Sequence, residues 1–342
     1  MRPVVDPDLA AMMEAVFTEY RDAHPNAPVA HRDAGLWQRL DELGLVRLTG
    51  AEDVGGSGAG WFEAAELLSA AARHAVRIPL AEHDLLACWL LDAAGVTGEG
   101  SDRAVRTVCR LDAEGAARNV PWATGADRIA LVWPVGSGYH GADVDIATVE
   151  ITPGRNAIGE PRDSVAADLS LLDGVPVAAA LVTQLDMKAA LIRSIQICSA
   201  LDRIVELSIE HAVSRKQFGR PLSRFQAVQS LIADLAAEAA LARAATESTL
   251  AQAVGTEWSA EDLEFRVAVA RSCTGHAASA VVRNAHQVHG AMGTTREHRL
   301  HEFTRAALAW RSEFGSVRYW DEKVTEVALG AGAAGLWSTI AR

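Results

Sequence analysis

The sequence has little cysteine and no close pair of cysteines. The four thiols, Cys88, Cys109, Cys198 and Cys273, are far apart and form no C-x-x-C motif. A disulfide framework or a structural zinc site needs paired or closely spaced thiols, so this spacing argues against both kinds of site. Four isolated thiols are best suited to a reducing compartment, and we therefore expect a cytoplasmic protein.

Long apolar runs and an excess of basic charge are also missing. No stretch approaches the run of about 18 apolar residues that a membrane-spanning helix requires, and Met1 to Asp8 has no apolar signal-peptide core. The chain has 32 Lys and Arg against 44 Asp and Glu, a formal net charge of −12. Nucleic-acid binding relies on clustered cations. We expect neither a membrane span nor a nucleic-acid partner.

The 342 residues have the composition of an ordinary globular protein. Their residue pattern changes twice along the chain, which gives three successive regions. Helical apolar spacing over 36–44 and 62–72 predicts helices in the first hundred residues. Short apolar runs punctuated by Gly and Pro then predict a compact β region. Long amphipathic segments follow and predict an antiparallel helical bundle. The expected division is a helical domain over 1–104, a reduced β domain over 105–185 and a helical bundle over 186–342.

Two serines in the bundle region predict helix starts. Ser223 has Gln226 three positions later, which is the pattern of a capping box. Ser259 with Asp262 has a similar pattern before the next long apolar segment. We therefore expect long helices to begin at these two places.

Several patterns suggest a functional site that their context does not support. The Gly-rich loop 55–60 has no strand before it and the wrong Gly spacing for a dinucleotide fingerprint, so we interpret it as a helix–helix turn. His286 and His289 are three apart, as are His298 and His301, but no acidic or thiol ligands complete a set, so no metal site is predicted. G-x-S-x-G is absent, which argues against a nucleophile-elbow hydrolase.

Two further segments contain residue types that can contact a ligand. From Arg215 to Leu222, three cations flank Phe218 where Gly and Pro make the backbone tight. Such a connector can pair Arg with phosphate and place Phe against a flat ring, although a cationic helix C-terminus has the same composition. Residues 287–293 end a predicted helix at a run of small residues, which suits either close approach of a ligand or a simple Gly C-cap.

Together these segments resemble the two signature stretches of the acyl-CoA dehydrogenase family. The stretches are SRKQFGRPLSRFQAVQ and, about 70 residues later, HQVHGAMGTTREH. The N-terminal LWQRLDELGLVRLTGAEDVGGSGAG is similar to the family's first helical domain. The resemblance implies a mainly α fold with a small β domain, arranged α–β–α with a C-terminal antiparallel four-helix bundle. It also implies FAD as cofactor, α,β-dehydrogenation of an acyl-CoA, and an electron-transfer flavoprotein or similar acceptor.

The resemblance also implies that FAD lies between subunits and contacts both segments. The implied cofactor-binding residues are Arg215, Gln217, Phe218, Gln287, Gly290 and Gly293. By this resemblance the first three contact the ADP part across a dimer interface. The last three hold the adenosine and pyrophosphate of the neighbouring subunit's FAD. Ala291 departs from the family, whose members usually have a second Gly there.

The family's reaction needs a carboxylate base, and the expected positions do not hold one. In many members a Glu precedes a Gly-Thr pair downstream of the second motif, but this position holds Phe314, with Glu313 one place early. Adjacent residues do not share a helical face. Other members carry the base 25 or 26 residues before the motif Arg, where this chain has Ala190 and Ala189. The catalytic base is therefore unassigned, and Glu313 is the remaining candidate.

The middle region departs from the family as well. The T-E-P loop and W-I-T segment that contact the isoalloxazine are not found, and residues 120–132 are similar to the β-domain entry of shorter members. The Gln expected after Gly-Thr is replaced around Arg318. Such a chain resembles the short subunit of heteromeric α2β2 acyl-CoA dehydrogenases of bacterial steroid side-chain degradation. In those enzymes a longer partner supplies the base and the isoalloxazine pocket.

Three hypotheses stay open. The chain is a base-less subunit of a heteromeric acyl-CoA dehydrogenase, a self-sufficient homo-oligomeric enzyme with Glu313 or another carboxylate as base, or a non-enzymatic scaffold on the same fold. The sequence does not specify the acyl group, because chain-length and ring specificity depend on pocket shape.

Overall fold

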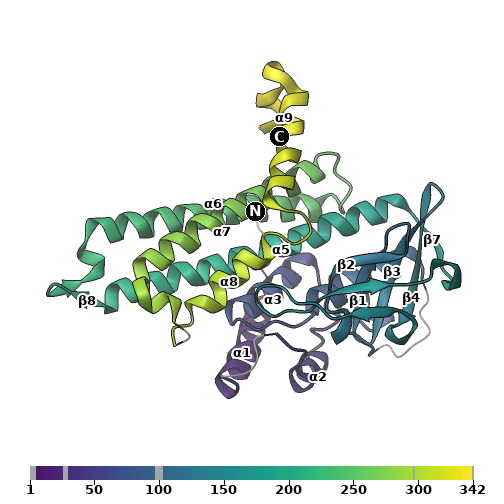
Figure 1. Cartoon of the computed structure of the whole chain (residues 1–342), viewed down its shortest axis with the longest axis horizontal. Helices are drawn as coiled ribbons and strands as arrows, with labels where there is room; N and C mark the ends of the chain where they lie inside the picture. The colour runs from purple at the N-terminus through teal and green to yellow at the C-terminus, as the bar shows by residue number, and fades with distance from the viewer. Residues whose placement is uncertain (1–4, 26–29, 97–102, 296, 341–342) are drawn as a thin grey trace. The chain divides into compact units, whose positions relative to one another are not determined.

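The computed structural model describes residues 5–25, 30–96, 103–295 and 297–340. Residues 1–4 of the N-terminal segment and Arg296 of the second motif lie outside the described residues. The chain divides near residue 189 into two compact units, each with its own internal contacts. The order of elements is helical, then β, then helical, which confirms the expected α–β–α fold class (Figure 1). The domain boundaries at 104/105 and 185/186 stay a prediction.

The first unit begins with helices. They are α1 (Pro7–Ala23), α2 (Ala34–Glu42), α3 (Trp61–Arg73), the π-helix η2 (Ala81–Cys88) and α4 (Trp89–Ala94). Asp33 caps α2, because its Oδ1 accepts a hydrogen bond from the Leu36 N–H at 2.8 Å and so satisfies a first-turn donor. The helices expected over 36–44 and 62–72 are confirmed by α2 and α3.

The Gly-rich segment forms a tight connection between α2 and α3. Gly55 has a φ of 77°, a conformation that favours glycine. A Cβ on Gly56 would lie 2.0 Å from the carbonyl oxygen of Gly50, so the chain passes too close to itself there for any side chain. These glycines are explained by the turn, as the sequence predicted.

Two small sheets follow the helices of the first unit. One sheet has the order β1-β3-β4-β7, formed by β1 (Arg106–Arg110), β3 (Arg128–Val135), β4 (Gly138–Asp145) and β7 (Val175–Val177). The other has the order β2-β6-β5, formed by β2 (Ala116–Pro121), β6 (Arg162–Ala166) and β5 (Glu150–Thr152). Ile129, Leu131 and Trp133 alternate along β3 and lie in one buried cluster with Val120 and Val165. The predicted β region is therefore confirmed.

The second unit is a bundle of long helices. They are α5 (Ala179–Ser214), whose first residues belong to the first unit, α6 (Gln226–Gly255), α7 (Leu263–His289), α8 (Leu300–Trp310) and α9 (Val317–Ile340). Figure 1 shows α6 and α7 side by side along much of their length. Cys198 of α5 contacts Thr246 of α6 at 3.4 Å between Sγ and Oγ1. The helix α9 is interrupted at Gly332, whose φ is 61° and ψ 178°.

The two predicted capping boxes are wrong. Ser223 lies inside a 3₁₀ turn, so α6 begins only at Gln226, with Phe225 as an N-cap that makes no side-chain bond. Likewise α7 begins at Leu263 without a side-chain cap. The Ser259 hydroxyl donates instead to the Thr256 carbonyl at 2.6 Å, closing the turn after α6. The Ser223 carbonyl, not its side chain, meets the helix, because it accepts a hydrogen bond from Gln229 Nε2 at 2.9 Å.

No helix among the described residues combines the length and apolar character that crossing a bilayer demands. All four cysteines are free thiols.

Candidate functional site

The first motif forms a tight β-hairpin between α5 and α6. Strand β8 (Lys216–Gln217) pairs antiparallel with β9 (Arg220–Pro221), and only two residues form the turn. These residues, Phe218 and Gly219, have φ values of 50° and 78°. Positive φ at both central positions is typical of a type I′ turn, whose twist matches that of the flanking strands. Glycine adopts it freely, whereas a bulky residue there is strained by about 1–3 kcal/mol.

The hairpin presents Phe218 to solvent. The side chain is 90% exposed, and its ring meets Phe225 edge-on with 6.2 Å between centroids. The Arg220 guanidinium lies 4.2 Å from the centroid of the Phe225 ring. Arg215 and Gln217 are exposed as well. A strained, exposed aromatic beside exposed cations buries its apolar area only when a flat ligand or another subunit binds there.

The second motif forms the end of α7 and the turn that follows it. Gly290 is the C-cap, with φ 58° and ψ −143°, a conformation suited to glycine. Gln287 and Gly290 are exposed, and a Cβ on Gly290 would meet no atom within 4 Å. Gly293 is buried, and a Cβ there would lie 2.8 Å from His289 Cβ and 3.1 Å from Leu300 Cδ2. The backbone at Gly290 is open to a ligand, whereas packing requires Gly293.

The same turn contributes to a cluster of three histidines. His211 lies near the end of α5, His289 ends α7 and His298 precedes α8. The rings of His211 and His289 stack with 4.5 Å between centroids, and that of His298 meets His289 at 4.8 Å. Burial lowers the pKa of all three, to about 4 for His289. In the sequence only pairs of histidines three residues apart stood out, and His211 has no such neighbour.

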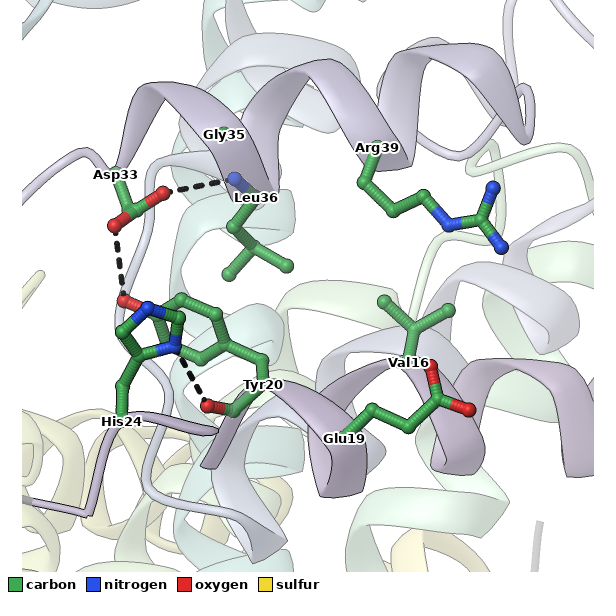
Figure 2. A pocket seen from close by; sticks show the side chains of 8 residues that line it. All are labelled: Val16, Glu19, Tyr20, His24, Asp33, Gly35, Leu36 and Arg39. Carbon is green, nitrogen blue, oxygen red and sulfur yellow. Dashed lines mark hydrogen bonds between the residues drawn. The ribbon is translucent and has the colours of Figure 1, made fainter. Parts of the chain in front are cut away.

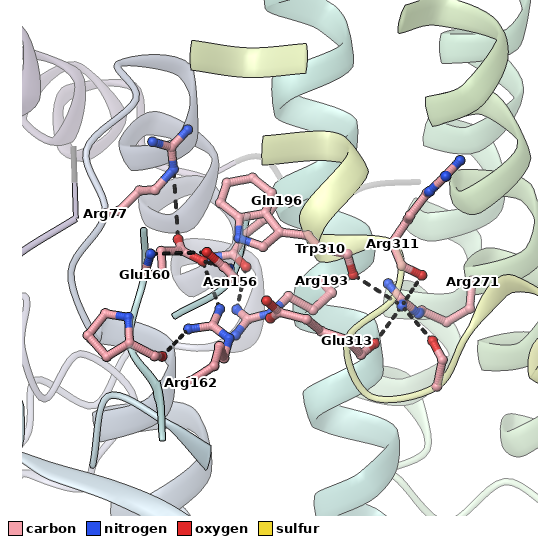
Figure 3. A network of polar contacts seen from close by, with 12 residues as sticks. Arg77, Asn156, Glu160, Arg162, Arg193, Gln196, Arg271, Trp310, Arg311 and Glu313 are labelled. Atoms are coloured by element: carbon pink, nitrogen blue, oxygen red, sulfur yellow. Dashed lines mark hydrogen bonds and ion pairs between the residues drawn. The ribbon is translucent and has the colours of Figure 1, made fainter. Parts of the chain in front are cut away.

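Glu313 lies in the turn after α8, and its carboxylate is already bound. Its Oε2 accepts a hydrogen bond from Arg193 Nε at 2.7 Å, with the two side chains 13% and 2% exposed (Figure 3). Phe314 has a φ of 51°, and the Arg193 guanidinium lies 5.3 Å from its ring centroid. The candidate base and the residue at the expected base position therefore both face the same buried cation.

A second buried arginine fixes the backbone of that turn. Arg271 Nη2 donates to the carbonyl oxygens of Glu313 at 2.7 Å and Arg311 at 3.2 Å (Figure 3). Burial lowers the pKa of Arg271 to about 9, and Glu313 opposes that shift. The guanidinium is still protonated at neutral pH. One arginine thus holds the side chain of Glu313 and another holds its backbone.

The alternative base position lies on α5 and contains no acid. Ala189 and Ala190 are both buried. The preceding residue, Lys188, is 1% exposed, and its Nζ lies 4.6 Å from the Trp61 ring centroid and 4.3 Å from that of Trp89. Burial lowers the pKa of Lys188 to about 7. The sequence did not single out Lys188, because its two aromatic neighbours come from separate helices.

A pocket of about 280 Å³ lies between α1 and α2 (Figure 2). The Tyr20 hydroxyl donates to Asp33 Oδ2 at 3.4 Å there, while Asp33 Oδ1 caps α2. None of the residues singled out by the two motifs lines this pocket. Asp33 and Tyr20 are engaged in the helix cap and the contact beside it.

Known proteins share this sequence pattern. Residues 178–318 match the family model described as acyl-CoA dehydrogenase, C-terminal domain. Acyl-CoA dehydrogenase FadE28 of Mycobacterium tuberculosis is 30% identical over 233 residues, which cover 60% of this chain and 68% of that protein. The chain belongs to the acyl-CoA dehydrogenase family.

Two further proteins are similar to this chain in sequence or in fold. Acyl-CoA dehydrogenase IpdE2 of Mycobacterium tuberculosis is 26% identical over 287 residues, which cover 80% of each protein. The crystal structure of the ChsE4-ChsE5 complex from Mycobacterium tuberculosis contains a chain with the same fold. It matches with a TM-score of 0.80 and 21% identity, over 96% of this chain and 99% of that chain.

For an acyl-CoA dehydrogenase family member FAD is the expected cofactor. The exposed Phe218 and the open backbone at Gly290 fit a cofactor that arrives from outside the chain. Gly293 does not share this accessibility, because its neighbours already occupy the space of a Cβ. The roles of these residues toward FAD stay a prediction.

Proposed function

We propose that this chain is the short, supporting subunit of a heteromeric acyl-CoA dehydrogenase whose longer partner supplies the catalytic base. The observation that carries the proposal is the pairing of Glu313 with Arg193 at 2.7 Å. A general base must come within about 3 Å of the proton that it removes. Glu313 instead directs Oε2 at a buried cation, and the Arg193 guanidinium occupies the oxygen that would have to face the substrate.

We infer that the exposed motif residues bind FAD at a subunit interface. Arg215, Gln217 and Phe218 are assigned to the ADP part, with the guanidinium suited to phosphate and the ring suited to a flat partner. Gln287 and the Gly290 backbone are assigned to the adenosine and pyrophosphate, and Gly293 supports them through packing. When bound, FAD supplies the two-electron acceptor of the reaction.

The proposed reaction is the α,β-dehydrogenation of an acyl-CoA thioester, with a steroid side chain as the substrate class. The resemblance to short subunits of steroid side-chain degradation supports this choice, as does the name of a solved structure with the same fold, the Tcur3481-Tcur3483 steroid ACAD. We expect an electron-transfer flavoprotein or a similar acceptor to receive the electrons. A cytoplasmic location and the division at 104/105 and 185/186 belong to the same proposal.

The test is to purify the chain alone and after co-expression with a longer acyl-CoA dehydrogenase subunit from the same organism. We expect little FAD absorbance and no turnover from the chain alone, and both from the complex. Stoichiometric FAD and turnover without a partner would show the self-sufficient homo-oligomeric enzyme with Glu313 or another base. A flavin-containing complex that reacts with no acyl-CoA would show a scaffold.

A further inference from the structure

We propose that His211, His289 and His298 form a binding site for a divalent transition metal ion, with Zn²⁺ as the best-suited ion. The three residues come from the end of α5, the end of α7 and the turn before α8. Their ligand nitrogens all lie within 4.8 Å of one another. Within the described part of the chain, this is the one cluster of three or more potential ligands. Imidazole nitrogen suits Zn²⁺, Cu²⁺ and Ni²⁺.

His289 is already oriented as a ligand. It is 4% exposed, and its Nδ1–H donates to the Ala285 carbonyl at 2.8 Å. This bond places the lone pair on Nε2, which is buried and makes no hydrogen bond. Metal-binding histidines usually donate their other N–H to a carbonyl or carboxylate in this way. The Leu207 carbonyl also faces the ring and favours its protonated form, so the test must separate a proton from a metal ion.

The spacing of the rings fits one ion. Zn–N bonds of 2.0–2.1 Å in a tetrahedral site place imidazole centroids about 5 Å apart and ligand nitrogens about 3.4 Å apart. The three centroid distances are 4.5, 4.8 and 6.2 Å. The rings are therefore close to the required separation, and their nitrogens must turn inward by roughly 1–1.5 Å. A three-histidine set leaves the fourth position to water.

His298 is the ligand that has to move. It is half-buried in a turn, and its Nδ1 accepts a hydrogen bond from the Leu300 N–H at 3.2 Å. Ligation through Nδ1 would release that amide at the first residue of α8. First-turn amides have no partner within the helix and are readily hydrated. The nearby Glu210 carboxylate favours positive charge at His298, which helps to offset the charge of the ion.

The site would join the two motif segments. His211 lies four residues before Arg215, where α5 leads into the hairpin, and His289 lies between Gln287 and Gly290. A metal ion held by both helices would fix the end of α5 against the end of α7. From the sequence we expected no metal site, because only the pairs His286–His289 and His298–His301 had a suitable spacing. In the structure His289 and His298, one from each pair, lie together with His211 of α5.

The experiment titrates the metal-free full chain with Co²⁺, whose tetrahedral complexes absorb visible light, and then with Zn²⁺. We expect one Co²⁺ per chain with tetrahedral bands, and displacement by Zn²⁺. His298→Gln and His211→Gln should each weaken Co²⁺ binding at least tenfold. His301→Gln and His276→Gln are matched controls and should leave binding unchanged, because neither residue belongs to the cluster. Zn²⁺ should raise the Tm of the wild type but not that of His298→Gln.

Several outcomes would overturn the site. Absence of tetrahedral bands in the wild type would do so, as would bands that persist in His298→Gln or disappear in His276→Gln. An unchanged Tm on adding Zn²⁺ would show that no metal ion binds the folded chain at the cluster. The half-buried His298 is the decisive position, because its variant should still fold, and circular dichroism checks this. The titration uses no flavin and no acyl-CoA, so its result is independent of the proposed function.

Discussion

Arg193 Nε lies 2.7 Å from Glu313 Oε2, although 120 residues of chain separate the two partners. The ion pair fastens α5 to the turn after α8, and both side chains are largely shielded from water. Removing one member of such a pair leaves the other charge buried and uncompensated. The pair thus gives Glu313 a structural task that does not require access to a substrate.

Replacement of Glu313 separates a structural from a catalytic carboxylate. Glu313→Gln keeps the shape and one acceptor but loses the charge. We expect turnover of the assembled enzyme to stay within a few-fold, while the free energy of unfolding falls by about 1–3 kcal/mol. Steady-state kinetics and urea unfolding measure the two effects. Glu322→Gln, which breaks an exposed pair with Arg318, should change stability by less than about 1 kcal/mol. A fall in kcat of about 10²–10⁴ would show that this chain carries its own base.

Removal of the Arg215 guanidinium tests its assignment to the FAD phosphates. Arg215→Ala should weaken FAD retention in the assembled complex about tenfold or more, because a hydrogen bond to a charged group contributes roughly 1.5–3 kcal/mol. Flavin fluorescence after dilution or dialysis measures the loss. Arg224→Ala is the control, since Arg224 is also exposed and lies in the neighbouring 3₁₀ turn. Equal flavin affinity in both variants would remove Arg215 from the site.

Relief of the strain at Phe218 should raise stability and weaken flavin binding together. Phe218→Asn gives the Asn-Gly pair that type I′ turns prefer, so the isolated chain should gain up to about 1 kcal/mol. The same variant loses the exposed ring and should retain less FAD in the complex. Urea unfolding and flavin content report the two effects. Gly219→Ala, which puts a side chain at a φ of 78°, should instead destabilise the hairpin. Unchanged flavin content in Phe218→Asn would argue that the ring contacts no cofactor.

Acidification should destabilise the metal-free chain through the histidine cluster. His289 has a pKa of about 4 in the folded chain against an ordinary value of 6.5, so the unfolded chain binds more protons between those values. The stability that depends on neutral His289 is fully present above pH 6.5 and is lost as the pH falls toward 4. After allowance for solvent screening it amounts to roughly 1–2 kcal/mol.

The matched comparison is the pH slope of urea unfolding in the wild type and in His289→Gln, both with a chelator present. The variant should show the smaller slope between pH 7 and 5. A comparison is needed because Asp84, whose pKa burial raises to about 6, acts in the opposite direction. Equal slopes would exclude His289 as the titrating group.

Local pattern in the sequence predicted the elements and both motif segments. The helices expected over 36–44 and 62–72 follow from apolar periodicity, and the tight connector at Phe218 follows from its Gly and Pro, whereas its strand pairing was not predicted. The capping boxes failed because a serine three positions before Gln226 can equally lie in a 3₁₀ turn. Sequence spacing alone does not distinguish the two geometries.

Contacts between segments far apart in the chain could not be predicted from the sequence pattern. Arg193 is an unremarkable helical residue until the fold brings it to Glu313, and His211 has no local spacing that relates it to His289. Lys188 likewise meets Trp61 and Trp89 only after three helices have packed. Periodicity reports which face of a helix is buried, but it does not report which partner lies across from it.

The turn at Phe218 and Gly219 has a consequence for how fast subunits and cofactor come together. Its two-residue loop and paired strands hold the ring outward before anything binds, so little further ordering of the loop is required at the moment of contact. Partners that are already rigid associate at rates set mainly by diffusion and orientation, and mutations at their contacts act mostly on dissociation. Changes at this tip should therefore alter how long a complex survives far more than how quickly it forms.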